Sequence, residues 1–131
     1  MRTLILVCLA VLVAGCGPKK QDYSAPGLIK SLKDKDPDVR STAATALGKY
    51  APAAKEAVPP LTDALKDEDK HVRKAACYSL ARFGRDARDA LPALKQTLQD
   101  KDQKVRDAAA YALKEIQNPS PTPPAHKKKG T

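Results

Sequence analysis

Three stretches of the chain repeat one pattern: LIKSLKDKDPDVRSTAATAL at residues 28–47, LTDALKDEDKHVRKAACYSL at 61–80 and LKQTLQDKDQKVRDAAAYAL at 94–113. They align without gaps at a period of 33 residues, and 12 of 33 positions are identical between the first two full units. A fixed period of this length is typical of stacked supersecondary units, each of which cannot bury its apolar side alone. The repeat therefore decides the fold before any single helix is considered.

Each unit predicts two helices joined by a short charged turn. The first helix is expected over 28–34, 61–67 and 94–100, where leucines four residues apart form one apolar stripe. An aspartate three residues before a valine is expected to cap the second helix, at Asp36, Asp69 and Asp102. From that valine, apolar residues recur at offsets of four, eight and eleven, which places them on one buried face. They are Val39, Ala43, Leu47 and Tyr50; Val72, Ala76, Leu80 and Phe83; and Val105, Ala109, Leu113 and Ile116.

The pattern Leu-x3-Leu-x-Asp-x-Asp-x2-Val-Arg-x2-Ala-x3-Leu resembles HEAT repeats of the short bacterial, phycobilin-lyase-like kind, over about residues 25–117. The resemblance implies an all-α fold, an α-solenoid of the armadillo-like superhelical type. Its three helix pairs would span 25–58, 59–91 and 92–117, with the second helices lining a concave inner face. Three units are about the minimum that can bury a continuous core. Neither end carries an obvious polar capping repeat, so the terminal helices are expected to be exposed or covered by a partner.

One arginine and one aspartate recur in register in every unit. The arginine directly follows the valine, and the aspartate closes the predicted first helix. Because the units stack, this register predicts a structural ladder of arginine–aspartate contacts between successive units. The alternative is a row of arginines that binds phosphate. The residues are Arg40, Arg73 and Arg106 with Asp34, Asp67 and Asp100.

A second recurring set lies on the opposite side of the second helices. Offset six from the valine is roughly opposite the buried stripe, and offsets two and ten flank it. Exposed tyrosine and arginine are enriched at interaction hot spots, so this side is predicted to bind a protein partner. The alternative is an ordinary solvated surface. The predicted partner-binding residues are Tyr78, Tyr111, Lys74, Arg82, Lys49 and Thr45.

Catalytic motifs are absent from the sequence. His71 and His126 have no Cys or His at ligand spacing, and there is no His-Glu dipeptide of the kind that holds iron in deoxyhypusine hydroxylase, an enzyme of similar repeats. Aromatic residues make up only 4% of the chain, which disfavours a large aromatic-lined cofactor pocket. We therefore expect no enzyme activity, metal or cofactor, and a packing role for Cys77. The alternative is an enzyme or enzyme accessory of the phycobilin-lyase-like class that handles a chromophore.

The N-terminal segment has the pattern of an export signal. Residues 4–14 are an apolar run behind Arg2, shorter than a membrane span and typical of a secretory signal peptide. Residues 12–16 (LVAGC) resemble a bacterial lipobox, which implies that residues 1–15 are removed and that Cys16 is acylated. Residues 16–24 would then tether the protein to the cell envelope, and Gly17 favours the outer membrane over the inner. The alternative is a plain secretory signal.

The C-terminal tail is rich in proline and has basic residues near its end. Residues 118–131 contain four prolines and are expected to be disordered. Lys127, Lys128 and Lys129 either contact an anionic surface such as lipid headgroups or are simply solvated.

The chain carries a net charge of +9, but residues 25–117 hold 18 basic against 14 acidic side chains. A nearly balanced repeat region in an exported protein argues against a nucleic-acid partner.

Overall fold

A computed structural model describes residues 22–121 of the protein. Over that range the chain forms helices joined by turns and contains no strand, which confirms the all-α prediction. The elements in order are α1 (Ala25–Ser31), α2 (Pro37–Lys49), the 3-10 helix η1 (Lys55–Ala57), α3 (Val58–Ala64), α4 (Lys70–Phe83), the 3-10 helix η2 (Gly84–Ala90), α5 (Leu91–Thr97) and α6 (Gln103–Gln117).

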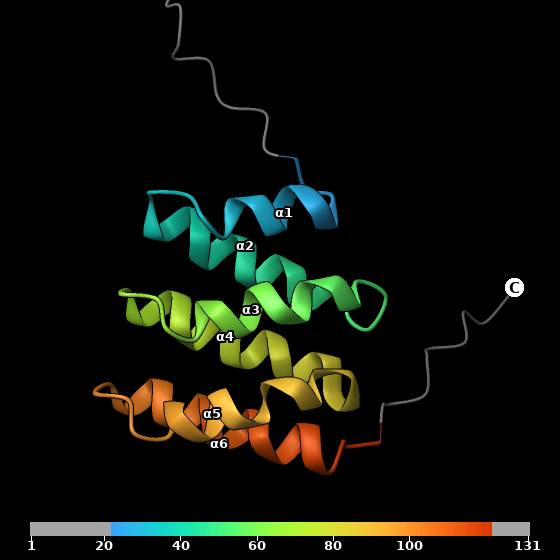
Figure 1. The fold of residues 1–131 in the computed structure, drawn as a ribbon, viewed down its shortest axis with the longest axis vertical. Coiled ribbons are helices and arrows are strands. Elements are labelled where there is room, and N and C mark those ends of the chain that lie inside the picture. The colour runs from blue at the N-terminus through green and yellow to red at the C-terminus, as the bar shows by residue number, and fades with distance from the viewer. Residues whose placement is uncertain (1–21, 122–131) are drawn as a thin grey trace, which may run out of the picture.

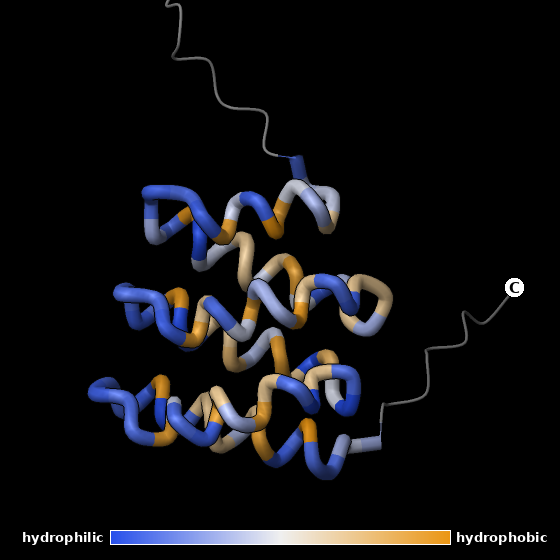
Figure 2. The backbone as a smooth tube through the Cα atoms, in the orientation of Figure 1, coloured by the Kyte–Doolittle hydropathy of each residue, from blue (hydrophilic) through white to orange (hydrophobic). Residues whose placement is uncertain are grey.

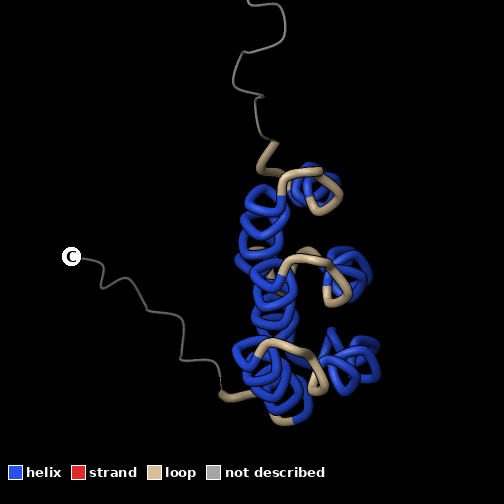
Figure 3. Tube along the Cα trace, turned by 90° about the vertical axis from the view of Figure 1, so that its left-hand side faces the viewer, coloured by secondary structure: helices blue, strands red, loops and turns tan. Residues whose placement is uncertain are grey.

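The helices form two layers that run along the stack (Figures 1 and 3). One layer holds α1, α3 and α5, and the other holds α2, α4 and α6. Each first helix packs on the second helix of its own unit, and α4 packs between α2 and α6. The three helix pairs are therefore stacked in chain order, as the repeat predicts for an α-solenoid.

The first helices lie three residues earlier than the sequence pattern predicted. They begin at Ala25, Val58 and Leu91 and end at Ser31, Ala64 and Thr97. Each starts early because it contains proline in its first turn, where the missing N–H has no helical partner to lose. Each ends early because the following aspartate belongs to the turn. The carboxylates of Asp34, Asp67 and Asp100 accept the backbone N–H two residues ahead at 2.9 Å in all three turns.

The second helices begin where the capping pattern placed them. Asp36, Asp69 and Asp102 are the N-caps of α2, α4 and α6, and each side chain accepts backbone N–H groups of the first turn. Ser24, at the end of the predicted tether, caps α1 in the same way by accepting the N–H of Gly27.

The core lies between the two layers and is made mostly of small and aliphatic residues. Hydrophobic positions gather where the helices meet, whereas the turns between the helices of each pair are hydrophilic (Figure 2). The predicted stripe is fully buried in the middle unit, but Val39 and Leu113 in the outer units are half-buried because a neighbouring unit covers them from one side only.

Tyr50 is the one stripe residue that the prediction misplaced, because it is 41% exposed rather than buried. Its hydroxyl donates a hydrogen bond of 2.6 Å to the backbone oxygen of Tyr23, at the open end of the stack. Phe83 and Ile116 occupy the same position in the next two units and are buried. A phenol at this position keeps its polar end at the surface, whereas Phe and Ile have none to satisfy.

No helix among residues 22–121 is long and apolar enough to cross a membrane. The predicted signal peptide (1–15), the lipidation site Cys16 and the basic residues 127–129 lie outside the described residues.

Candidate functional site

The three turns within the helix pairs, at residues 32–36, 65–69 and 98–102, lie along one side of the stack, on the left in Figure 1. We call this side the turn edge. Arg40 donates from Nε and Nη2 to the two carboxylate oxygens of Asp67, at 2.8 and 2.9 Å. Arg73 binds Asp100 in the same bidentate way, at 2.7 and 2.9 Å. The turn edge therefore contains two rungs, each of which joins one unit to the next.

Each rung arginine also holds the turn of its own unit. Nη1 of Arg40 donates to the backbone oxygens of Asp34 and Lys35, at 2.8 and 3.1 Å. Nη1 of Arg73 binds the equivalent oxygens of Asp67 and Glu68, at 2.9 and 3.0 Å. The guanidinium edge that would grip a phosphate in two places is thus occupied by a carboxylate, so the geometry of these two arginines is that of a structural link.

The rungs are shielded from water. The side chains of Arg73 and Asp100 are 6% and 11% exposed. The hydrogen bonds from Arg73 hold the pKa of the Asp100 carboxyl below its usual value. Asp100 therefore stays ionised down to acidic pH, and the rung persists with it.

Two members of the predicted ladder have no rung partner. Arg106 donates from Nη1 to the backbone oxygens of Asp100 and Lys101 and from Nη2 to Gln103, but it makes no ion pair within residues 22–121. Asp34 likewise has no ion pair in that range, although its carboxylate accepts the N–H of Asp36. The reason is that rungs form between units, so the first aspartate and the last arginine lack a neighbouring unit.

The predicted partner-binding tyrosines lie side by side. Tyr78 on α4 and Tyr111 on α6 are 46% and 48% exposed, and their ring centroids are 5.7 Å apart with the planes tilted by 50°. We call these two residues the tyrosine pair. It is an exposed aromatic patch on the layer of second helices, held on two helices that pack against each other.

Basic side chains lie one helical turn to either side of Tyr78, whereas Asp107 and Glu115 hold the same positions beside Tyr111. Arg82 is exposed, and its Nε donates to the backbone oxygen of Gly48 at 2.9 Å, so it also links α4 to α2. Lys74 is half-buried and lines a small hollow together with Lys70 and Asp102. Both predicted residues therefore neighbour Tyr78, but Arg82 is partly used inside the fold.

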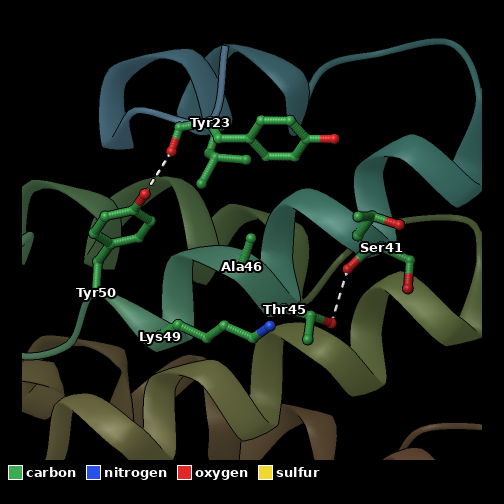
Figure 4. Close-up of a pocket in the computed structure, with 8 residues that line it drawn as sticks. Tyr23, Ser41, Thr45, Ala46, Lys49 and Tyr50 are labelled. Carbon is green, nitrogen blue, oxygen red and sulfur yellow. Dashed lines mark hydrogen bonds between the residues drawn. The ribbon is translucent and has the colours of Figure 1, made fainter. Parts of the chain in front are cut away.

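Thr45 and Lys49, the other two predicted partner residues, lie at a different place. They line a groove of about 600 Å³ at the N-terminal end of the stack (Figure 4). We call it the N-terminal groove, and its lining residues are Tyr23, Leu28, Ser41, Thr42, Thr45, Ala46, Lys49 and Tyr50. The Thr45 hydroxyl donates to the backbone oxygen of Ser41 at 3.0 Å. The six predicted residues thus divide between the tyrosine pair and this groove.

Helices α2 and α4 approach each other closely at a contact that the sequence pattern did not predict. The hydroxyl of Ser79 is buried and donates to the backbone oxygen of Ala44 at 2.6 Å. A Cβ atom added to Gly48 would lie 2.7 Å from Ser79 Oγ and 3.1 Å from Ser79 Cα. The signal that could have found this contact is the run of small residues at equivalent positions of all three units, at Ala46, Ser79 and Ala112.

Cys77 is fully buried, and burial raises the pKa of its thiol to about 12. A thiol that stays protonated at neutral pH is a poor nucleophile, so Cys77 has the environment of a packing residue. Residues 22–121 contain no group of three or more His, Cys, Asp or Glu side chains that could hold a metal ion.

Stacked helix pairs with a repeated arginine–aspartate rung define the class of the protein as an α-solenoid of short helical repeats. The family model of HEAT repeats matches residues 25–114, and the chain belongs to this family. A comparison with curated protein sequences finds no significant match.

Two solved structures illustrate the relationship. A chain in the complex of CpcE and CpcF of phycocyanin lyase from Nostoc sp. PCC7120 is 32% identical with a TM-score of 0.68, and the match covers 79% of this chain and 40% of that chain. An engineered protein is 28% identical with a TM-score of 0.57, and the match covers 71% of this chain and 45% of that one. The protein is thus related to phycocyanin lyase subunits but spans less than half the length of either chain.

Proposed function

We propose that this protein is a non-catalytic HEAT-repeat scaffold, anchored in the bacterial cell envelope, that holds a protein partner through the tyrosine pair. The observation that carries the proposal is that Tyr78 and Tyr111 are each nearly half exposed and that their rings are neighbours. Large aromatic side chains in this state bury much apolar area on binding at a small cost in side-chain entropy.

The rigidity of the surface supports the same conclusion. Tyr78 stands on α4, whose Arg73 is bound to the turn before α6, the helix that carries Tyr111. The two helices that carry the rings are therefore fixed relative to each other before a partner arrives, which lowers the entropic cost of association. Lys74 and Arg82 lie beside Tyr78, so we expect a partner that presents an apolar group to the rings and carboxylates to the basic side chains. The related lyase subunits occur in a complex of two different subunits, which is consistent with subunit binding by this type of repeat.

The decisive experiment combines cross-linking with mass spectrometry of co-purified envelope proteins and a surface variant. Y78S together with Y111S should abolish recovery of the partner and leave the protein folded, with a melting temperature lowered only slightly, because both residues are nearly half exposed. The matched control is Y23S, which removes an exposed ring at the other end of the stack. Partner recovery that survives the double substitution would contradict the proposal.

The anchoring part of the proposal rests on the lipobox-like residues 12–16. A diacylglyceryl group and a further acyl chain on Cys16 would fix the protein to a membrane, since more than one fatty chain gives stable attachment. C16S should remove palmitate labelling and release the protein from the membrane fraction. A protein that remains in the membrane pellet, unlabelled before and after the substitution, would exclude lipidation.

The basic tail is assigned a supporting role at the envelope surface. Lys127, Lys128 and Lys129 would each add about 1 kcal/mol of attraction to an anionic surface. Removal of the last five residues should therefore weaken binding to anionic vesicles, and more so at low salt. Binding that does not change with this truncation at any salt concentration would leave the tail without this role.

A second function is favoured by one observation, the relationship to phycocyanin lyase subunits. In this alternative the protein is a subunit or accessory of a chromophore-handling enzyme. Visible absorbance of the protein purified after incubation with a bilin distinguishes the two functions. A bound chromophore would support the alternative, and a colourless protein that still recovers its partner would support the scaffold.

A further inference from the structure

The N-terminal groove lies on a surface that the other two units use for stacking. Its residues Ala46 and Lys49 occupy the positions held one unit later by Ser79 and Arg82. Ser79 and Arg82 bind the backbone of the preceding second helix, at Ala44 and Gly48. The groove is therefore the first repeat interface of the solenoid, formed on one side and lacking the preceding unit.

At each end of the turn edge one member of a rung lacks its ion-pair partner within residues 22–121, and the two unpaired residues have opposite charges. Asp34 has the conformation of Asp67 and Asp100, because its carboxylate accepts the same backbone N–H at 2.9 Å. Arg106 grips the two backbone oxygens of its own turn as Arg40 and Arg73 do. Within the described residues, one end thus offers a carboxylate without an arginine, and the other end offers an arginine without a carboxylate.

We infer that a second copy of this chain occupies the N-terminal groove by end-to-end stacking. Helix α6 of one copy lies against α2 of the next, and Arg106 of the first copy pairs with Asp34 of the second. The contact continues the interface that already joins α2 to α4 and α4 to α6 within one chain. It also pairs Asp34 and Arg106, the two members of the arginine–aspartate ladder that make no ion pair within residues 22–121.

Lys114 sets the strength of this association. It occupies the position of Gly48 and Ala81, the small residues through which one second helix approaches the next. The position accepts no more than a methyl group at the two internal interfaces, whereas lysine has a long side chain that must be turned aside when α6 meets α2. The contact is consequently weak and reversible in the natural chain. Because its two halves are different surfaces, stacking does not close at a dimer and extends with concentration.

The test is sedimentation velocity of the full-length chain over about 10 µM to 1 mM, the range in which a weak contact is populated. The natural chain should sediment faster as its concentration rises, without a plateau at the dimer. D34R and R106D should each remain monomeric, because each places like charges at the contact. An equimolar mixture of these two variants should recover the association, since every contact is again between opposite charges. D63R is the control for net charge, because Asp63 is exposed on α3 away from both ends, and it should behave as the natural chain does.

K114G provides a second, independent measurement. It restores the small residue at the stacking position and should tighten the association at least about tenfold, the factor that follows from about 1.4 kcal/mol of relieved crowding. Thermal melting of each variant identifies any that is unfolded.

A natural chain and a K114G variant that are both monomeric throughout the range would overturn the inference. Association that D34R and R106D leave unchanged would overturn it as well, because the contact would then lie elsewhere. If removal of residues 1–21 were needed before any stacking appeared, the N-terminal segment would be the occupant of the groove, and a second copy would not. Loss of partner binding through Y78S and Y111S is a separate result, since those side chains lie outside the groove.

Discussion

The two edges of the stack differ in how closely their structure repeats from unit to unit. At the turn edge, Asp67 and Asp100 receive the same two hydrogen bonds from the arginine of the preceding unit, and all three turns close in the same way. At the opposite side, which we call the loop edge, residues 50–57 and 84–90 differ in sequence and in conformation. Tyr50 is exposed, whereas Phe83 at the same position is buried, and only the second loop opens with a glycine, Gly84, at a φ of +52°.

This difference indicates that the turn edge fixes how each unit aligns with the next. At the turn edge the four rung residues Arg40, Asp67, Arg73 and Asp100 each bond both within their own unit and to a neighbouring unit, so a change at one of them disturbs two units. At the loop edge the contacts are mainly apolar and tolerate different solutions as long as the interior is filled. Four predictions test whether this division holds.

Phe83→Ala should have the largest effect. The side chain is 3% exposed, and its loss leaves a cavity between α4 and the neighbouring helices, at a cost of about 4 kcal/mol. Tyr50→Ala removes the equivalent ring of the first unit, which is 41% exposed, and should cost about 1 kcal/mol. Urea denaturation of both variants measures the difference. If both variants lose the same free energy of unfolding, the equivalent positions of the loop edge contribute equally despite their different burial.

Arg73→Ala should cost about 3 kcal/mol, because it leaves the Asp100 carboxylate shielded from water without its partner. The matched control is Arg106→Ala, which removes the same side chain from a position with no aspartate opposite it within residues 22–121. That variant should lose about 1 kcal/mol or less. If the two arginine variants unfold at the same urea concentration, the rungs do not stabilise the stack.

Gly48→Ala should destabilise the protein by about 2 kcal/mol, although alanine is ordinarily the better helix former. The new methyl group would meet Ser79 and push α2 away from α4. The double variant with Ser79→Ala should recover only part of the loss, since the Cβ and backbone of residue 79 remain in the way. A Gly48→Ala variant that is more stable than the natural chain would show that this contact is loose.

The smallest effect is a pH dependence at the turn edge. The pKa of Asp100 lies below its usual value of 3.8 in the folded chain, so folding favours the ionised form. Its contribution to stability is present above about pH 4 and is lost as the pH falls through the folded value. The gap between the melting temperatures of the natural chain and Asp100→Asn should therefore be constant near neutral pH and narrow progressively as the pH falls below about 4. A gap that does not narrow at acidic pH would contradict the ion pair.

The 33-residue repeat was sufficient to predict the fold. The wrong predictions concern the boundaries of the first helices and the burial of Tyr50, which the repeat does not determine. The N-caps Asp36, Asp69 and Asp102 were found because capping is local chemistry. The first helices were misplaced by three residues because the leucine stripe continues from the helix into the turn. Tyr50 was misplaced because periodicity counts it as apolar, whereas its hydroxyl donates to the backbone oxygen of Tyr23 and keeps the residue partly exposed.

The candidate site was predicted in composition but not in arrangement. Offsets along a helix identified Tyr78 and Tyr111 as neighbours on one side, and their rings are 5.7 Å apart. The same offsets could not show that Thr45 and Lys49 line a separate groove, because that groove depends on how residues 22–24 approach α2. Nor could they reveal the contact at Gly48, since the spacing of two helices is a property of their packed side chains.

The rung that spans 27 residues has a consequence for how such a gene changes. When one whole unit is lost or duplicated, the arginine of one unit again faces the aspartate of the following unit, and the rung can form in the same geometry. Excision of residues 59–91, for example, would bring Arg40 against Asp100 in place of Asp67. A deletion of another length within a helix or within a turn of the turn edge would shift the residues that form the rungs out of register. Recombination between whole units therefore preserves the rungs and is a productive source of new variants.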